Sequence, residues 1–244
     1  DVLGDINLVK GILKDELIAI RDKFGDERLT EIQNVEDEID IEDLIEEEQC
    51  VFTLSHAGYI KRVPASTYRA QKRGGKGVVG ATTREEDFVE QMYVTSTHDP
   101  LMFFTSRGRV YQLNCYEIPE AGRPARGPAI INLLQLDPGE KVTAMLPVPA
   151  EKVEGHYLVM ATRRGIIKRT ALDEFTNLRK AGLIAMVLRE DDDLIGVALT
   201  DGTSEVLLGS RNGMAIRFAE SDMRPIGRNA MGVKSMELDE GDEV

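Results

Sequence analysis

The spacing of apolar residues changes along the chain and divides it into a helical start and a long β-rich remainder. Over residues 5–24 the apolar positions recur about every 3.6 residues, which predicts an amphipathic α-helix. Asp5 is placed to cap its first turn and Gly25 to stop its last turn. We expect one face of this helix to pack on a neighbour. The apolar positions on that face are Ile6, Val9, Ile12, Leu13, Leu17, Ile20 and Phe24.

From Cys50 onward, short β-type runs repeat. Four times an apolar strand ends in Ser or Thr, two residues follow, and then come a Gly and another strand. This order predicts a hairpin whose Gly adopts a positive φ. The four turns are Ser55–Gly58, Thr105–Gly108, Thr162–Gly165 and Ser210–Gly213, with glycines 50, 57 and 48 residues apart.

A second glycine follows the first in every repeat, at intervals of 19, 19, 17 and 19 residues. These second glycines are Gly77, Gly127, Gly182 and Gly232. A turn-like segment precedes each of them, at Ala65–Tyr68, Tyr116–Pro119, Leu172–Phe175 and Ala219–Met223. A period near 50 with about four strands per unit is typical of a propeller-like ring of small sheets.

The pattern therefore predicts an all-β fold, a propeller-like β-pinwheel of four-stranded blades, preceded by an N-terminal α-helix. We place the helix at residues 1–25, a linker at 26–49 and the pinwheel at 50–244. The blades are predicted at 50–100, 101–155, 156–204 and 205–244. The last lacks a full set of strands, and we expect the chain to be a piece of a longer protein.

Charge is distributed unevenly between these parts. Residues 1–49 hold 17 acidic and 5 basic side chains, whereas residues 50–244 hold 26 and 25. The formal net charge of −13 thus belongs mostly to the start of the chain, including the acidic linker. A local basic surface on the nearly neutral remainder is compatible with nucleic-acid binding.

Cations recur at equivalent positions of the repeats, which predicts a belt of positive charge around the perimeter. Such a belt neutralises phosphates without reading sequence, and it favours DNA that can be bent around it. The predicted belt consists of Lys61, Arg62, Arg69, Arg107, Arg109, Arg123, Arg126, Arg163, Arg164, Lys168, Arg169, Arg179, Lys180, Arg211, Arg217 and Arg228.

Several other site types are disfavoured. Cys50 and Cys115 form no CxxC pattern, so we expect free thiols in a reducing cytoplasm rather than a disulfide or a zinc site. No apolar run is long enough to span a bilayer, and no signal peptide is recognisable at the start. The three histidines are scattered, and Asp191–Asp193 is interpreted as a solvated loop. We predict no metal site, no cofactor and no catalytic residue.

One run stands apart from this background. Residues 71–77 place three cations and three glycines in seven positions, inside a stretch from His56 to Arg84 that has no Asp or Glu. Lys76 is followed by Gly77, so the pattern of a nucleotide-binding P-loop is not met. The predicted DNA-contacting residues of this run are Gln71, Lys72, Arg73, Gly74, Gly75, Lys76 and Gly77.

This run, called the box below, resembles the box motif found in the C-terminal domains of DNA gyrase A subunits, with Lys72 where Arg is common. The flanks at Thr53–Lys61, Thr97–Asp99 and Phe104–Tyr111 resemble the same family, and Asp26–Ile32 resembles the segment after its coiled coil. The resemblance covers essentially the whole chain. It implies a six-bladed β-pinwheel whose blades exchange strands and whose basic rim wraps duplex DNA, with the box on the first blade.

The resemblance further implies a larger parent protein, the gyrase A subunit, which works with a B subunit in an A2B2 enzyme in the bacterial cytoplasm, close to the nucleoid. ATP and Mg²⁺ would act elsewhere in that enzyme, and the isolated domain would be monomeric. None of the six tyrosines has the context of a DNA-cleaving nucleophile. Two alternatives stay open, a topoisomerase IV A-type subunit and a propeller scaffold that binds proteins.

Overall fold

A computed structural model describes residues 4–26, 41–68, 75, 77, 80, 86–148, 153–176, 178 and 181–244. Contacts divide the chain into two units, residues 1–41 and 42–244. In the first unit, α1 spans Ile6–Phe24, and the Asp5 carboxylate accepts a hydrogen bond from the Asn7 amide at 2.9 Å. The predicted helix and N-cap are therefore confirmed. The apolar face of α1 is exposed in the described part of the chain, so its packing on a neighbour stays a prediction. None of the described helices has the length and hydropathy needed to cross a bilayer.

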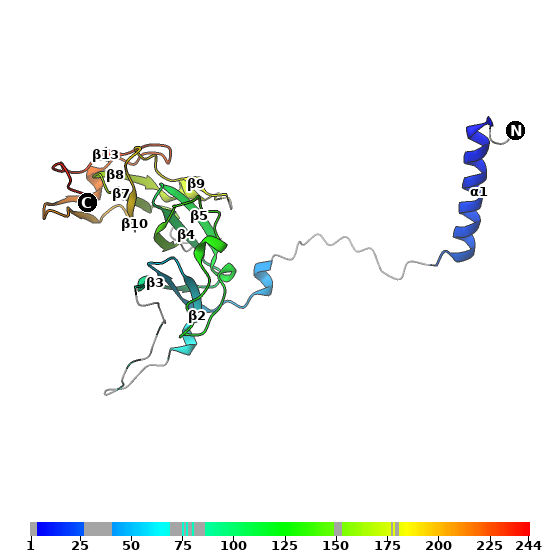
Figure 1. The fold of residues 1–244 in the computed structure, drawn as a ribbon, viewed down its shortest axis with the longest axis horizontal. Helices are drawn as coiled ribbons and strands as arrows, with labels where there is room; N and C mark the ends of the chain where they lie inside the picture. Colours follow the sequence, from blue (N-terminus) through cyan, green and yellow to red (C-terminus); the bar gives the residue numbers. More distant parts are fainter. Residues whose placement is uncertain are drawn as a thin grey trace. The chain divides into compact units, whose positions relative to one another are not determined.

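The second unit is built from strands, with short 3-10 helices between them (Figure 1). Each repeat begins with an antiparallel hairpin, and in the first three repeats a third strand returns to pair with the first. The hairpins are β1 (Gln49–Ser55) with β2 (Ile60–Pro64), β4 (Pro100–Thr105) with β5 (Arg109–Asn114), β7 (Tyr157–Thr162) with β8 (Ile166–Ala171), and β11 (Glu205–Gly209) with β12 (Ala215–Ala219). The returning strands are β3 (Val89–Ser96), β6 (Val142–Pro147) and β10 (Leu194–Thr200).

We call the sheet built on each hairpin a blade, numbered 1 to 4 in chain order. Two blades are completed by a strand of the following repeat. β9 (Leu183–Ile184) pairs with β5 of blade 2, and β13 (Val233–Lys234) pairs with β8 of blade 3. In blade 1 the equivalent contact is a bridge between Tyr59 and Ala129. The predicted all-β fold with an N-terminal helix is confirmed.

The hairpin glycines have the positive φ values that the repeat predicts, from 72° at Gly108 to 93° at Gly213. Short 3-10 helices lie in the predicted turn-like segments, directly after the second strand of each hairpin. They span Ala65–Thr67, Cys115–Glu117, Leu172–Phe175 and Glu220–Asp222, with two more at Ile41–Leu44 and Ile130–Asn132.

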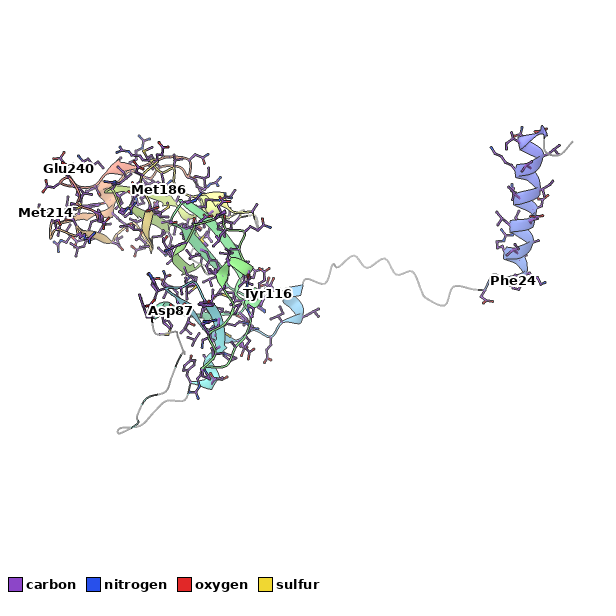
Figure 2. All side chains as sticks on the ribbon, viewed as in Figure 1. Phe24, Asp87, Tyr116, Met186, Met214 and Glu240 are labelled. Carbon is purple, nitrogen blue, oxygen red and sulfur yellow. The ribbon has the colours of Figure 1, made fainter. Side chains whose placement is uncertain are left out.

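The core lies between neighbouring blades. Phe52 and Leu54 of β1 are buried in one cluster with Phe103 of blade 2, whereas Met102 of the same strand lies in a cluster with Met160 of blade 3. Alternate residues of one strand thus pack on opposite neighbours, as period-2 strands require. Met186, labelled in Figure 2, is 1% exposed within the second cluster.

In repeats 2 to 4, the second glycine lies where the repeat contacts the blade before it. Each has a positive φ, and a Cβ atom at Gly182 would lie 2.6 Å from the Tyr111 ring. At Gly127 it would overlap the Ile60 carbonyl oxygen, and at Gly232 it would come within 2.6 Å of the Ile167 carbonyl oxygen. These three positions need glycine for close approach as well as for φ.

A carboxylate closes the hairpin turn of every repeat by accepting hydrogen bonds from the Ser or Thr hydroxyl or from turn amides. In blade 3, Asp192 accepts from the Thr162 hydroxyl at 2.6 Å and from the Arg164 amide at 2.9 Å. The equivalent acids are Asp87, Glu140 and Asp242. Asp192 is 7% exposed, so the prediction of a solvated Asp191–Asp193 loop was wrong for its middle residue.

We expect Asp192→Asn to destabilise the protein by about 1–3 kcal/mol, since a charge-assisted bond is lost and a buried amide group must find new partners. The measurement is the urea midpoint of unfolding. Asp191→Asn, at the exposed neighbour, is the matched control and should change stability by less than about 0.5 kcal/mol. Equal effects of the two variants would contradict the buried role of Asp192.

Candidate nucleic-acid interface

The box residues fall largely outside the described part of the chain. Of residues 71–77, the structure describes Gly75 and Gly77, and Gly77 has a φ of 78°. The predicted contacts at Gln71, Lys72, Arg73, Gly74 and Lys76 lie outside the described residues. The same holds for Arg69, Arg179 and Lys180 of the belt.

Lys61 does not belong to an exposed belt. Its residue is 1% exposed, and its ammonium group donates to main-chain carbonyl oxygens instead of pointing to solvent. The acceptors are Gly80 at 3.1 Å, Gly122 at 3.3 Å, Arg123 at 2.5 Å and Ala125 at 2.8 Å. The predicted phosphate contact at Lys61 was therefore wrong, because the main chain at Gly80 and residues 122–125 encloses this ammonium group.

Lys168 repeats this arrangement in blade 3, and it too was wrongly predicted as a surface contact. It is 1% exposed, and its ammonium donates to the carbonyl oxygens of Gly227 at 3.1 Å, Arg228 at 2.7 Å and Ala230 at 3.2 Å. Burial lowers the pKa of Lys168 to about 8. Its neighbour Arg169 is 7% exposed, with its guanidinium 4.5 Å from the centre of the Tyr157 ring, and it is likewise unavailable.

Several belt arginines are exposed or half-buried but paired with carboxylates. Arg163 lies 2.8 Å from Asp193, and Arg211 lies 2.9 Å from Glu243. Longer pairs join Arg217 to Glu205 at 3.5 Å, Arg109 to Asp137 at 3.7 Å and Arg62 to Glu48 at 3.7 Å. Because each partner cancels charge locally, these arginines attract phosphate less than the sequence pattern indicates.

Arg123 and Arg126 differ from those arginines. Arg126 lies over the Tyr59 ring at 3.9 Å, and Arg123 lies 6.0 Å from the centre of the Tyr68 ring. Within the described part of the chain, neither has a carboxylate partner within ion-pair distance. A guanidinium over an aromatic face keeps its charge and its N–H donors available. These two half-buried arginines are therefore the cationic pair next to blade 1 that, within the described residues, is held by aromatic rings and not by carboxylates.

The pairing of arginine with tyrosine was not predicted from the sequence. Nothing in the sequence distinguishes Tyr59 and Tyr68 from the other tyrosines of the chain. Arg126 is 67 positions from Tyr59 along the chain, and only strand exchange between repeats brings them together. Two further belt residues contact distant parts of the chain. The Arg107 guanidinium donates to the Pro138 carbonyl oxygen at 2.9 Å. The main-chain amide of Arg228 donates to the Glu174 carboxylate at 3.1 Å, a contact that does not involve the Arg228 guanidinium.

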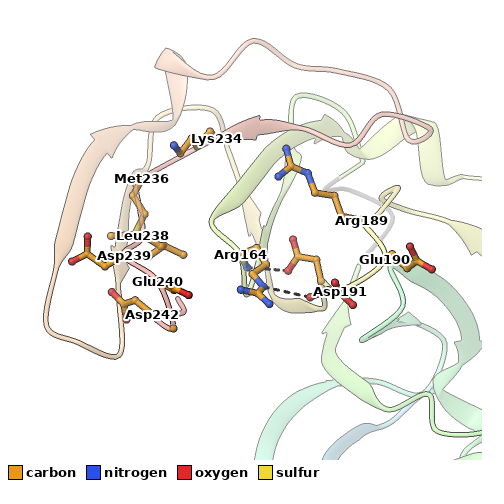
Figure 3. Close-up of a pocket in the computed structure, with 12 residues that line it drawn as sticks. Arg164, Arg189, Glu190, Asp191, Lys234, Met236, Leu238, Asp239, Glu240 and Asp242 are labelled. Carbon is orange, nitrogen blue, oxygen red and sulfur yellow. Dashed lines mark hydrogen bonds between the residues drawn. The ribbon is translucent and has the colours of Figure 1, made fainter.

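Arg164 lies in a pocket of about 620 Å³ between the blade 3 hairpin and the last residues of the chain (Figure 3). Arg189 and Lys234 also line it, but six acidic residues outnumber these cations. The acids are Glu190, Asp191, Asp192, Asp239, Glu240 and Asp242. An excess of carboxylates repels phosphate, so this pocket does not support a DNA contact at Arg164.

The described residues contain no group of three or more His, Cys, Asp or Glu side chains placed to hold a metal ion. Cys50 and Cys115 are free, as predicted, and both are buried. Burial raises the pKa of the Cys115 thiol to about 12, which leaves it protonated and unreactive at neutral pH.

Comparison with known proteins identifies this set of repeats. A sequence profile described as "DNA gyrase C-terminal domain, beta-propeller" matches residues 51–96, 99–149, 156–201 and 204–244. The chain belongs to the DNA gyrase C-terminal domain family. The resemblance carried by the box and its flanks is thereby confirmed.

Relatives of this gyrase domain agree with the assignment. The DNA gyrase A subunit of Clostridium acetobutylicum is 52% identical over 233 residues, which are 96% of this chain and 28% of that protein. The DNA gyrase A subunit of Staphylococcus aureus is 50% identical over 248 residues, which cover 100% of this chain and again 28% of that protein. The chain thus spans little more than a quarter of the relatives it matches.

Two solved structures share the fold. The C-terminal domain of a DNA topoisomerase IV matches with a TM-score of 0.70 and 30% identity, and the match covers 82% of this chain and 60% of that domain's chain. A DNA gyrase A C-terminal domain matches with a TM-score of 0.61 and 28% identity, and the match covers 80% of this chain and 63% of that domain's chain.

Proposed function

We propose that this chain binds, bends and wraps duplex DNA without regard to sequence. In the parent protein, the wrap would present a neighbouring DNA segment to the cleavage gate, so that the enzyme introduces negative supercoils at the expense of ATP. The partners are then duplex DNA, the rest of the gyrase A subunit and the B subunit, in an A2B2 complex of the bacterial cytoplasm near the nucleoid. The chain itself has a binding role, and catalysis belongs to other parts of that enzyme.

One observation carries the proposal. The stretch from His56 to Arg84 contains seven Lys and Arg residues and no acid, and five of them remain when the buried Lys61 and the paired Arg62 are set aside. The described arginines of blades 3 and 4, in contrast, are largely paired or lie among carboxylates. Positive charge in excess is thus concentrated at blade 1 and at the adjoining Arg123 and Arg126. A cationic surface of this kind binds phosphates and releases their counterions.

A gyrase role is favoured over a topoisomerase IV role. The box at residues 71–77 is intact, and the full-length relatives at about half identity are DNA gyrase A subunits. The structural match to a topoisomerase IV domain supports the shared fold and keeps that enzyme as the second candidate.

We expect the full chain to bind linear duplex DNA with an affinity that falls steeply as salt rises. If six or more phosphates are neutralised, affinity should fall about 10³-fold between 50 and 200 mM salt, because counterion release drives binding. Fluorescence anisotropy with two unrelated duplex sequences measures both the slope and the lack of sequence preference.

Binding that does not respond to salt, or no binding to duplex DNA at all, would contradict the wrapping function. The second result would instead favour a protein-binding scaffold, the remaining alternative. A single strand of equal length is the control, and it should bind more weakly because the chain offers few aromatic rings for base stacking.

A further inference from the structure

The loop formed by residues 119–130 of the second repeat is folded around a single buried ammonium group. Both ends of the loop are fastened to β2: the Arg62 amide donates to Pro119 at 3.3 Å, and the Ile60 amide donates to Pro128 at 3.0 Å. Between these two points Lys61 points into the loop and donates to three of its carbonyl oxygens. The loop backbone thus converges on Nζ of Lys61.

The same ammonium also bonds to the segment that follows the box. Its fourth acceptor is the carbonyl oxygen of Gly80, at 3.1 Å and three residues beyond the last glycine of the box. Lys61 therefore joins two parts of the chain that are about 40 residues apart, Gly80 and the loop that carries Arg123 and Arg126.

A lysine is suited to this position because its ammonium has only donors and carries a full charge. Bonds from a charged donor to carbonyl oxygens are stronger than neutral ones, and together they offset the cost of burying the charge. An apolar replacement would leave four buried acceptors without this donor. Lys168 donates to three carbonyl oxygens of residues 227–230 in the same way, so a buried lysine of this kind occurs in two of the repeats.

We propose that Lys61 is a positioning residue that holds Gly80, three residues after the box, against the loop of residues 119–130, and so fixes where Arg123 and Arg126 meet DNA. The contact with DNA rests on the proposed function, whereas the anchoring of the two segments does not. Blades 2 and 4 lack this anchor, since Tyr111 and Ile216 occupy the equivalent strand position.

The test compares Lys61→Met with wild type in the full chain. The side chain keeps its length and loses its charge and donors, so amide hydrogen exchange in residues 119–130 should rise at least ten-fold. DNA binding should weaken at least ten-fold at the same salt, with a changed linking-number shift. Lys141→Met, at an exposed lysine of blade 2, is the matched control and should leave exchange unchanged.

Lys61→Tyr controls for loss of folding, because Tyr111 already occupies this position in blade 2 beside the equivalent second glycine. This variant should fold and still exchange faster in residues 119–130. Unchanged exchange in both variants would overturn the anchor. Faster exchange with unchanged DNA binding would overturn the positioning role, and failure of wild type to bind DNA would refute the proposed function while exchange still reports on the anchor.

Discussion

Replacing Lys72, Arg73 and Lys76 together by alanine is expected to abolish the change in linking number that this chain imposes on nicked plasmid closed by ligase in its presence. These cations lie in the acid-free stretch of the first repeat, so no carboxylate close in sequence compensates for their loss. Each cation that contacts a phosphate contributes about one unit to the salt dependence of binding, and the slope should therefore fall by about three. Topoisomer distributions measure the first effect and anisotropy titrations the second.

The matched control removes the same charge from a different place. Lys10, Lys14 and Lys23 lie on α1, outside the blades, and their replacement by alanine should leave the linking-number shift intact. A box variant that still shifts linking number like wild type would show that the box is not the wrapping element. An equal loss in the α1 control would show that total charge, and not its location, governs binding.

The repeat could be derived from the sequence because single residues define its turns. Each turn has a Ser or Thr and, three positions later, a glycine, and a second glycine follows about 19 positions further on. The positive φ of these glycines follows from the steric freedom that only glycine has. Strand pairing between repeats could not be derived from the pattern, because it depends on which blade each crossing segment reaches.

The candidate interface was harder to predict for a related reason. Cations at equivalent repeat positions predicted an exposed belt. Lys61 and Lys168 are buried instead, and their ammonium groups donate hydrogen bonds to main-chain carbonyl oxygens. The sequence also did not reveal which arginines have carboxylate partners. Arg163 and Arg211 are paired with Asp193 and Glu243, which lie about 30 residues further along the chain. The composition therefore located the basic region correctly but overestimated how many of its cations are free to bind phosphate.

Gly127→Ala is expected to destabilise the contact between blades 1 and 2 strongly, through two separate causes. The residue has a φ of 85°, which costs an L-residue about 1–2 kcal/mol. The new Cβ would also overlap the Ile60 carbonyl oxygen and lie 2.9 Å from Cβ of Lys61. Overpacking of this kind costs about 1–3 kcal/mol more, so the total loss should be about 2–5 kcal/mol.

Gly139→Ala separates the two causes, because Gly139 has a similar φ of 79° and its Cβ would meet only the Arg107 guanidinium at 3.9 Å. It should lose only the backbone part, about 1–2 kcal/mol. Urea midpoints at matched protein concentration give the difference, and hydrogen exchange in β2 shows whether the loss is local to blade 1. If both variants lose the same stability, the second glycine is required for its φ alone. A larger loss for Gly127→Ala establishes that close approach between repeats is what the second glycine provides.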